Sequence, residues 1–261
     1  ARSKGTDVVL TAGGPQSNHA MLTAACAGQL GMKSILVLKR RGELTGGNLI
    51  LDDIFDAEVR LVDTGSYDDV YAEMDQIMEQ LRAQGHTPYA IPVGGSVPLG
   101  CLGYINCAKE IANQAQELSI TFDAVISAVG SGGTYASLTL GTKLFLPGTR
   151  SIGIGVCDAP FAEIAMDLTA GAAELLETDI RVTREDIHIH YCIGSGYAIP
   201  SPEGCAAVHR LARTEGILID PVYTGKALAG FFQLLEQGAF DQDENILFVH
   251  TGGAGALFAV E

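Results

Sequence analysis

Short runs rich in β-branched residues alternate with longer amphipathic runs along the whole chain. Within residues 1–95 the short runs predict strands and the longer runs predict helices, with strands at 7–11, 34–38, 58–62 and 88–92 and helices at 18–30, 48–55 and 67–84. Strands that alternate with helices form a parallel sheet with helices on both faces. The alternation therefore predicts an α/β fold built on a doubly wound parallel sheet.

A glycine- and proline-containing break, Gly94-Gly95-Ser96-Val97-Pro98, interrupts this pattern. The alternation then resumes, with predicted strands at 124–129, 151–156, 188–192 and 245–249 and predicted helices at 99–118, 134–145, 161–176, 202–215 and 225–237. We place a domain boundary at the break. The prediction is two doubly wound parallel-sheet domains, a smaller one over residues 1–95 and a larger one over residues 96–261.

The charge of the chain excludes several classes of partner. Its 16 Lys and Arg residues against 31 Asp and Glu residues give a formal net charge of −15. A chain this acidic repels the phosphates of nucleic acids and anionic lipids. No apolar run approaches the length of a membrane span. The sequence predicts neither a nucleic-acid nor a membrane partner, so any anion it binds must be held by local groups such as backbone amides.

The cysteines and histidines point to no metal or disulfide chemistry. The six cysteines are scattered without a Cys-x-x-Cys pair, which is typical of reduced cysteines buried as small apolar residues, and a cytoplasmic location is predicted. His188 and His190 would lie on one face of a strand. No third ligand accompanies them at a recognisable spacing, so no metal site is predicted.

Three turns that contain glycine follow predicted strands, at 13–18, 130–134 and 251–255. In an open parallel sheet, ligands bind at the carboxyl ends of the strands. Glycines let the backbone approach a phosphate, and a following helix offers free N–H groups and the positive end of its dipole. The turn Gly130–Thr134 is the best candidate, because a strand precedes it and a helix follows it. An ordinary tight turn between strand and helix is the alternative.

The common nucleotide and nucleophile motifs are missing. Gly130-Ser131-Gly132 lacks the third glycine of a G-x-G-x-x-G fingerprint, and no G-x-x-x-x-G-K-[ST] loop occurs. Ser96 has Pro98 where a nucleophile elbow needs its second glycine. A phosphate-bearing cofactor other than a dinucleotide is the remaining interpretation.

The segment Gly13-Gly14-Pro15-Gln16-Ser17-Asn18-His19, followed by a helix of small residues, resembles a known family. It is similar to the Gln-Ser-Asn-His turn of the D-cysteine desulfhydrase / 1-aminocyclopropane-1-carboxylate deaminase family, which consists of pyridoxal-phosphate enzymes of fold type II, the tryptophan synthase β-subunit fold. Further blocks follow in the order of the family: Gly47–Asp52, Gly94–Ser96, Gly100–Tyr104, Gly130–Thr134, Gly196-Tyr197, Asp220–Lys226 and His250–Gly253.

The resemblance implies a set of residues that bind pyridoxal 5'-phosphate. Asn18 would hydrogen-bond the pyridoxal hydroxyl, and Thr251 would lie near the pyridine nitrogen. The cofactor phosphate would be held by the backbone amides of Gly130, Ser131, Gly132, Gly133 and Thr134, which agrees with the interpretation of this turn above.

The resemblance also implies residues that act on a small amino-acid substrate. Ser17, Asn18 and His19, at a helix start, would receive its carboxylate. Thr224 would be a further substrate contact. Tyr197 and Tyr223 would flank the substrate as proton-transfer or stacking groups and, with Ser17, form the catalytic set.

Two threonines indicate which branch of the family the chain resembles. Deaminases of the family carry Glu after the Asp-Pro-Val-Tyr tyrosine and Leu at the position of Thr251, whereas this chain has Thr224 and Thr251. A carboxylate beside the ring would change its electronics and supply a base, but threonines leave a neutral pocket suited to β-elimination. The resemblance thus implies a lyase that converts D-cysteine, or a related β-substituted amino acid, to pyruvate, ammonia and sulfide, and that forms a homodimer.

The Schiff-base lysine of the family lies upstream of the Ser17 turn, in a segment with no counterpart here. Lys4 is the only lysine before that turn and matches no such motif, and Lys226 lies in a family motif but not in the Schiff-base role. The larger domain is accordingly expected to lack its N-terminal part. Three alternatives stay open: a 1-aminocyclopropane-1-carboxylate deaminase, a cysteate sulfo-lyase, and a lysine-less protein that binds a phosphate ligand without catalysis.

Overall fold

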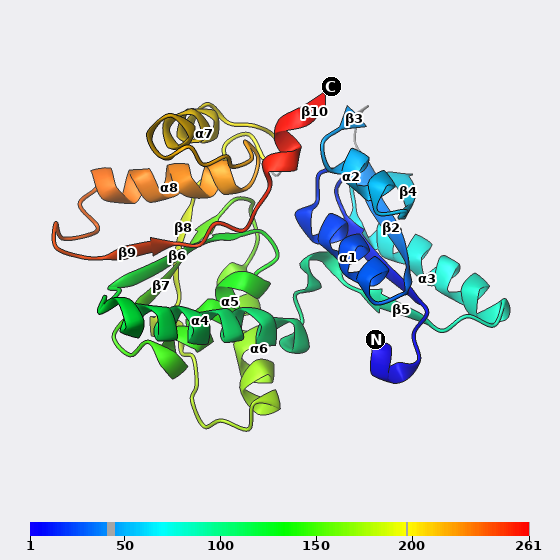
Figure 1. The fold of residues 1–261 in the computed structure, drawn as a ribbon, viewed down its shortest axis with the longest axis horizontal. Helices are drawn as coiled ribbons and strands as arrows, with labels where there is room; N and C mark the ends of the chain where they lie inside the picture. The colour runs from blue at the N-terminus through cyan, green and yellow to red at the C-terminus, as the bar shows by residue number, and fades with distance from the viewer. Residues whose placement is uncertain (41–44, 197, 261) are drawn as a thin grey trace. The chain divides into compact units, whose positions relative to one another are not determined.

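The computed structural model describes residues 1–40, 45–196 and 198–260, and the chain divides into two compact units (Figure 1). The first unit consists of Ala1–Gly95 and Gly253–Glu261, and the second of Ser96–Gly252. The C-terminal residues differ from the expectation, which assigned them to the second domain. The physical reason is a strand pair, since β10 (Ala259–Val260) is antiparallel to β3 (Thr45–Gly46) of the first unit.

The first unit is built on a four-stranded parallel sheet in the order β4-β2-β1-β5. Its strands are β1 (Val8–Gly13), β2 (Lys33–Arg40), β4 (Glu58–Asp63) and β5 (Pro88–Ile91), and its helices are α1 (Asn18–Gln29), α2 (Asn48–Ile54) and α3 (Tyr67–Ala83), with 3₁₀ turns at Arg2–Lys4, Val93–Gly95 and Ala254–Phe258. The predicted parallel sheet of this half is confirmed.

Helices cover the two faces of this sheet because each has one apolar face. On α3, Val70, Met74 and Ile77 recur at helical spacing and pack on Val8 and Leu10. Small alanines of α1 pack on the other face in a separate cluster, formed by Ala20, Ala24, Leu36 and Leu38. Alternate side chains of β1 and β2 thus enter different clusters, which is why both strands read as continuous apolar runs.

The second unit has its own four-stranded parallel sheet in the order β8-β7-β6-β9. Its strands are β6 (Ala124–Val129), β7 (Arg150–Gly155), β8 (His188–Tyr191) and β9 (Ile246–Phe248), and its helices are α4 (Pro98–Leu118), α5 (Gly133–Phe145), α6 (Phe161–Leu175), α7 (Pro202–Glu215) and α8 (Thr224–Glu236), with a 3₁₀ turn at Arg184–Asp186. Figure 1 shows α7 and α8 on one side of this sheet and α4 to α6 on the other.

Each of the three predicted glycine turns follows the carboxyl end of a strand. The first follows β1 and the second follows β6. The third follows β9, the direct neighbour of β6 in the sheet. The turns at 130–132 and 250–252 therefore meet at one edge of the second unit's sheet, which is the edge where parallel α/β sheets bind ligands. Among the residues described, no helix is both long and apolar enough to cross a bilayer.

Candidate functional site

The glycines of the turn that joins β6 to α5 have close neighbours where a side chain would lie. Gly132 is the N-cap of α5 and has φ 93°, a left-handed conformation that favours glycine. A Cβ on Gly132 would lie 2.7 Å from a methyl carbon of Ile164, and one on Gly133 would lie 2.7 Å from Ser96 Oγ. Because Gly132 has no side chain, it cannot cap the first N–H groups of the helix. The turn therefore offers the backbone donors that an anion needs.

Ser96 is a functional candidate that sequence reasoning missed. Its Oγ accepts a hydrogen bond from the backbone N–H of Gly133 at 3.0 Å and donates one to Ser131 Oγ at 2.8 Å. A sequence signal exists, since Ser96 lies in one of the blocks that resemble the family, but glycines and a proline around it indicate a domain boundary equally well. Ser96 thus occupies one of the five amides predicted to hold the phosphate and orients the hydroxyl beside it.

Asp220 organises the start of α8. Its Oδ1 accepts from the backbone N–H groups of Val222 at 2.9 Å and Tyr223 at 2.5 Å, and its Oδ2 accepts from the N–H of Thr224 at 2.9 Å. The Thr224 hydroxyl also donates to Oδ2 at 2.5 Å. One buried carboxylate, only 1% exposed, thereby holds both Tyr223 and Thr224 in place.

The Tyr223 ring lies against the predicted phosphate-binding turn. A Cβ on Gly130 would approach its Cε2 to 2.6 Å, so this glycine leaves the space that the ring fills. Burial, with the nearby charge of Asp220 as a second cause, raises the pKa of the Tyr223 hydroxyl well above its ordinary value. The hydroxyl therefore stays protonated at neutral pH, as a group that holds or donates a proton must.

The two threonines predicted to mark the branch of the family differ in their environment. Thr224 is fully buried, and its hydroxyl donates its one proton to Asp220 Oδ2, with Gly252 O at 3.3 Å from the same oxygen. The buried Oγ1 of Thr251, in contrast, has no hydrogen-bond partner among the described residues. A buried polar atom is normally paired, so Thr251 is the better placed of the two to bind a polar atom of a ligand.

Lys226 is fully buried in α8 and holds the turn that precedes Tyr197. Its Nζ donates to the carbonyl oxygens of Ile193 at 2.7 Å and Gly196 at 2.6 Å. Burial lowers the pKa of this ammonium group. Tyr197 itself, predicted to be catalytic, lies outside the described residues. The structure thus gives Lys226 a role that its sequence motif left unassigned.

In the first unit, Ser17 and Asn18 lie at the start of α1. Ser17 is the N-cap, and its Oγ accepts from the N–H of Ala20 at 3.1 Å. A Cβ on Gly13 would lie 2.7 Å from the Ser17 Cβ, so the glycine permits this close turn. Asn18 is the first helical residue, and its Oδ1 accepts from Asn48 Nδ2 at 2.8 Å. Both side chains therefore combine a structural bond with a position at a helix N-terminus.

His19 brings no positive charge to this helix start. Thr11 donates its single hydroxyl proton to Ile91 O, so the 2.8 Å contact between Thr11 Oγ1 and His19 Nε2 requires Nε2–H as the donor. Burial lowers the pKa of His19 to about 4, which keeps the ring neutral at pH 7. The one N–H of the neutral ring is thus committed to Thr11. The predicted contact of His19 with a substrate carboxylate stays a prediction, and this geometry does not favour it.

Asp52, which sequence reasoning left without a role, is a buried carboxyl on α2. It is 1% exposed, its Oδ1 has no partner among the described residues, and burial raises its pKa to about 7. Because this value exceeds the ordinary 3.8, the folded protein binds more protons than the unfolded chain between pH 4 and 7. The contribution of Asp52 to stability therefore falls as the pH rises through this window.

Replacing Asp52 with asparagine is expected to flatten this dependence. The variant should gain stability relative to the parent as the pH rises from 4 to 7, by at most about 4 kcal/mol. Urea unfolding at pH 4.5, 6 and 8 measures the effect, with the exposed Asp53→Asn on the same helix as the control. Parallel pH profiles for Asp52→Asn and the parent would contradict the prediction.

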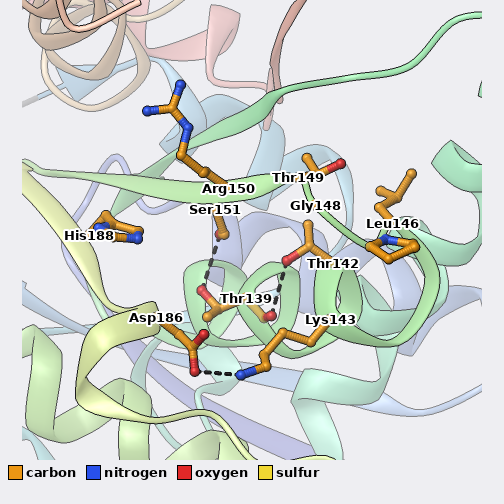
Figure 2. Close-up of a pocket in the computed structure, with 11 residues that line it drawn as sticks. Thr139, Thr142, Lys143, Leu146, Gly148, Thr149, Arg150, Ser151, Asp186 and His188 are labelled. Atoms are coloured by element: carbon orange, nitrogen blue, oxygen red, sulfur yellow. Dashed lines mark hydrogen bonds and ion pairs between the residues drawn. The ribbon is translucent and has the colours of Figure 1, made fainter.

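A pocket in the second unit lies away from all of these residues. It has a volume of about 350 Å³ and is formed by the C-terminal part of α5 and the amino ends of β7 and β8, that is, at the opposite edge of the sheet from the glycine turns. Figure 2 shows Lys143 paired with Asp186, at 2.6 Å, and Arg150 forms a second ion pair with Glu244, also at 2.6 Å. Since both cations are paired and no predicted site residue lines this pocket, it is not the candidate site.

The fold and the turns define the class of protein: two parallel α/β units with a glycine-rich anion site at the start of α5. A family model described as "Pyridoxal-phosphate dependent enzyme" matches residues 1–252. The chain therefore belongs to the family of pyridoxal-phosphate dependent enzymes, and the predicted fold class and cofactor are confirmed.

Individual proteins of this family are similar to the chain over most of its length. The D-cysteine desulfhydrase of Yersinia enterocolitica is 42% identical over 268 aligned residues, which cover 99% of this chain and 80% of that protein. The crystal structure of an ACC deaminase homologue matches with a TM-score of 0.90 and 37% identity, over 99% of this chain and 77% of that one. A threonine deaminase from T.th., at 21% identity and a TM-score of 0.62 over 95% of this chain and 78% of that one, shares the fold.

The residues present fit pyridoxal phosphate. The start of α5, where the N-cap Gly132 supplies no side-chain cap, and the three glycines whose Cβ positions are blocked suit a phosphate group. The unpaired Oγ1 of Thr251 lies in the neighbouring turn and suits a ring nitrogen. With a net charge of −15 on the whole chain, it is these neutral backbone and hydroxyl donors that must hold the phosphate.

Proposed function

We propose that the protein is a pyridoxal-phosphate dependent lyase that eliminates sulfide from D-cysteine, or another β-leaving group from a related amino acid, to give pyruvate and ammonia. The observation that carries the proposal is the neutral threonine pair, Thr224 and Thr251, beside the glycine turn at the edge of β6 and β9. Similarity to a D-cysteine desulfhydrase over nearly the whole chain supports it.

In this proposal the second unit holds the cofactor. The amides of the turn from Gly130 to Thr134 that Ser96 leaves free would bind its phosphate, and Thr251 Oγ1 would bond its ring nitrogen without supplying a charge. When bound, pyridoxal phosphate supplies an electron sink that stabilises negative charge at the substrate α-carbon. Ser96 would hold Ser131 and the amide of Gly133 in place, because both are hydrogen-bonded to its hydroxyl.

Residues at the starts of α1 and α8 would bind the substrate and handle its protons. The N-terminus of α1, with Ser17 and Asn18, would receive the substrate carboxylate through its backbone donors and dipole. Tyr223 would hold a proton at its hydroxyl for the leaving group, since its raised pKa keeps it protonated. Thr224 acts through Asp220, by fixing the turn that carries Tyr223. His19 would help to hold the start of α1 in place through its hydrogen bond with Thr11.

Cytoplasmic location and assembly as a homodimer also belong to the proposal. Scattered cysteines without a Cys-x-x-Cys pair support the first, and the family resemblance supports the second. Sedimentation of the purified protein at two concentrations would measure the oligomeric state.

The test is an assay of the purified protein loaded with pyridoxal phosphate. We expect pyruvate and sulfide in equal amounts from D-cysteine, and little from L-cysteine or 1-aminocyclopropane-1-carboxylate. Release of ammonia from 1-aminocyclopropane-1-carboxylate, with no sulfide from D-cysteine, would instead indicate a deaminase. Release of sulfite from cysteate would indicate a sulfo-lyase. Thr251→Val is the matched variant, because it removes the hydroxyl and keeps the shape.

A second measurement separates an enzyme from a protein that only binds the cofactor. Borohydride reduction of the loaded protein should leave the cofactor covalently attached to a lysine. Reversible binding with no reducible adduct would contradict the proposal and favour the binding protein.

A further inference from the structure

Asn48 is an almost completely enclosed polar side chain beside the α1 start. It begins α2, is 1% exposed, and uses its side-chain amide group for two bonds: Nδ2 donates to the carbonyl oxygen of Gln16 at 3.0 Å and to Asn18 Oδ1 at 2.8 Å. Its backbone N–H donates to Gln16 Oε1 at 2.8 Å. Asn48 therefore links the α2 start to the turn that carries Asn18.

These bonds determine which end of the Asn18 amide is free to donate. The backbone carbonyl of Gln16 can only accept, so the Asn48 group that faces it must be the NH₂. The same NH₂ faces Asn18, and two donors would repel, so the Asn18 atom on this side must be Oδ1. The Nδ2 of Asn18 is consequently the end that Asn48 leaves available to another partner.

The side chains around Asn48 have fixed hydrogen bonds of their own. Gln16 also donates from Nε2 to Gly46 O at 3.1 Å, so its own amide is fixed at both ends. A Cβ on Gly47 would collide with Gln16 Oε1, and one on Gly255 would lie 2.5 Å from Asn48 Oδ1. Gly47 also has φ 58° with ψ −133°, a combination that suits glycine. The hydrogen bonds of Gln16, Asn48 and Asn18 thus fit only one arrangement of the three amides.

We propose that Asn48 is a positioning residue for the cofactor, which fixes the Asn18 amide so that Nδ2 rather than Oδ1 is presented to the pyridoxal hydroxyl. The inference rests on the proposed function and on the contact between Asn18 and the pyridoxal hydroxyl that the family resemblance implies. A donor at that position stabilises the ionised hydroxyl, whereas an acceptor stabilises the protonated one. Asn48 therefore sets the protonation state of the bound cofactor without touching it.

The test is the pH-dependent absorbance of the bound cofactor in the full-length protein without substrate, which does not depend on the amino acid that the enzyme turns over. Asn48→Asp replaces the donor with an acceptor, so the Asn18 amide must turn over and present Oδ1. We expect the midpoint of the absorbance change to rise by about one pH unit or more. The exposed Asn113→Asp on α4 controls for the added negative charge.

A double variant distinguishes positioning from a general structural effect. If Asn48 acts through Asn18, then Asn48→Asp should cause no further shift in a protein that already carries Asn18→Ala. Asn48→Ala, which adds no charge and keeps the turn's backbone, should shift the midpoint in the same direction by less than Asn48→Asp. A midpoint that is unchanged in both Asn48 variants, or a shift of equal size with and without Asn18, would overturn the proposal.

Discussion

Replacing Asp220 with alanine is expected to lower the free energy of unfolding by about 3–5 kcal/mol and to abolish tight cofactor binding. The carboxylate is 1% exposed and accepts hydrogen bonds from three backbone N–H groups and one hydroxyl. Each donor left unpaired in a buried position costs about 1–3 kcal/mol, less any that solvent or relaxation recovers. Tyr223 would lose its position against Gly130, so the predicted phosphate-binding turn would loosen as well.

Urea unfolding and titration with pyridoxal phosphate measure the two effects. Asp220→Asn is expected to lie between the parent and Asp220→Ala, because one oxygen can still accept while the new NH₂ faces other donors. The exposed Asp243→Ala is the control and should change stability by less than about 0.5 kcal/mol. A loss below about 1 kcal/mol for Asp220→Ala would show that the α8 start does not depend on this carboxylate.

The second large effect is expected from Gly130→Ala, which should weaken pyridoxal-phosphate affinity at least about tenfold. The added methyl carbon would lie 2.6 Å from Cε2 and 3.3 Å from the hydroxyl oxygen of Tyr223, well inside van der Waals contact. Either the ring or the turn must then move, and overpacking of this kind costs about 1–3 kcal/mol. The Tyr223 ring and the glycine turn are both parts of the proposed cofactor site, so a shift of either one should weaken cofactor binding.

Gly103→Ala provides the matched control within the same unit. Gly103 lies exposed on α4 with no atom within 4 Å of its would-be Cβ, so alanine there should raise stability by up to about 1 kcal/mol and leave affinity unchanged. Combining Gly130→Ala with Tyr223→Ala removes the ring that the methyl group meets. If the affinity of Gly130→Ala equals that of the parent, the close packing of Tyr223 on this turn has no part in cofactor binding.

Much of the fold followed from local patterns. The predicted helices 134–145 and 202–215 correspond to Gly133–Phe145 and Pro202–Glu215, because apolar spacing and a glycine or proline at the start are local signals. The two-residue strands β3 and β10 were missed. They pair across more than 200 residues of chain and contain only two residues each, so no periodicity marks them. The grouping of 253–261 with the first unit could not be predicted for the same reason.

The candidate site, too, was predictable only in part from the sequence. Residue order alone located the turns at 13–18, 130–134 and 251–255, because glycines after a strand and before a helix start are visible in any short window. The tertiary structure decides which hydrogen-bond donors in and beside those turns remain free. Ser96 takes an amide of Gly133, Thr11 takes the one N–H of His19, and Asp220 takes the Thr224 hydroxyl.

The enclosure of Asn48, which orients Asn18, likewise depends on Gln16 and on Gly255. Partners such as Ser96 and Gly133, or Asn48 and Asn18, are some 30 or more residues apart in the chain. A hydrogen bond forms only when both of its groups lie within about 3 Å of each other. Local sequence therefore determines where polar groups and tight turns occur, while the packing of distant segments determines which of those groups remain free to bind the cofactor.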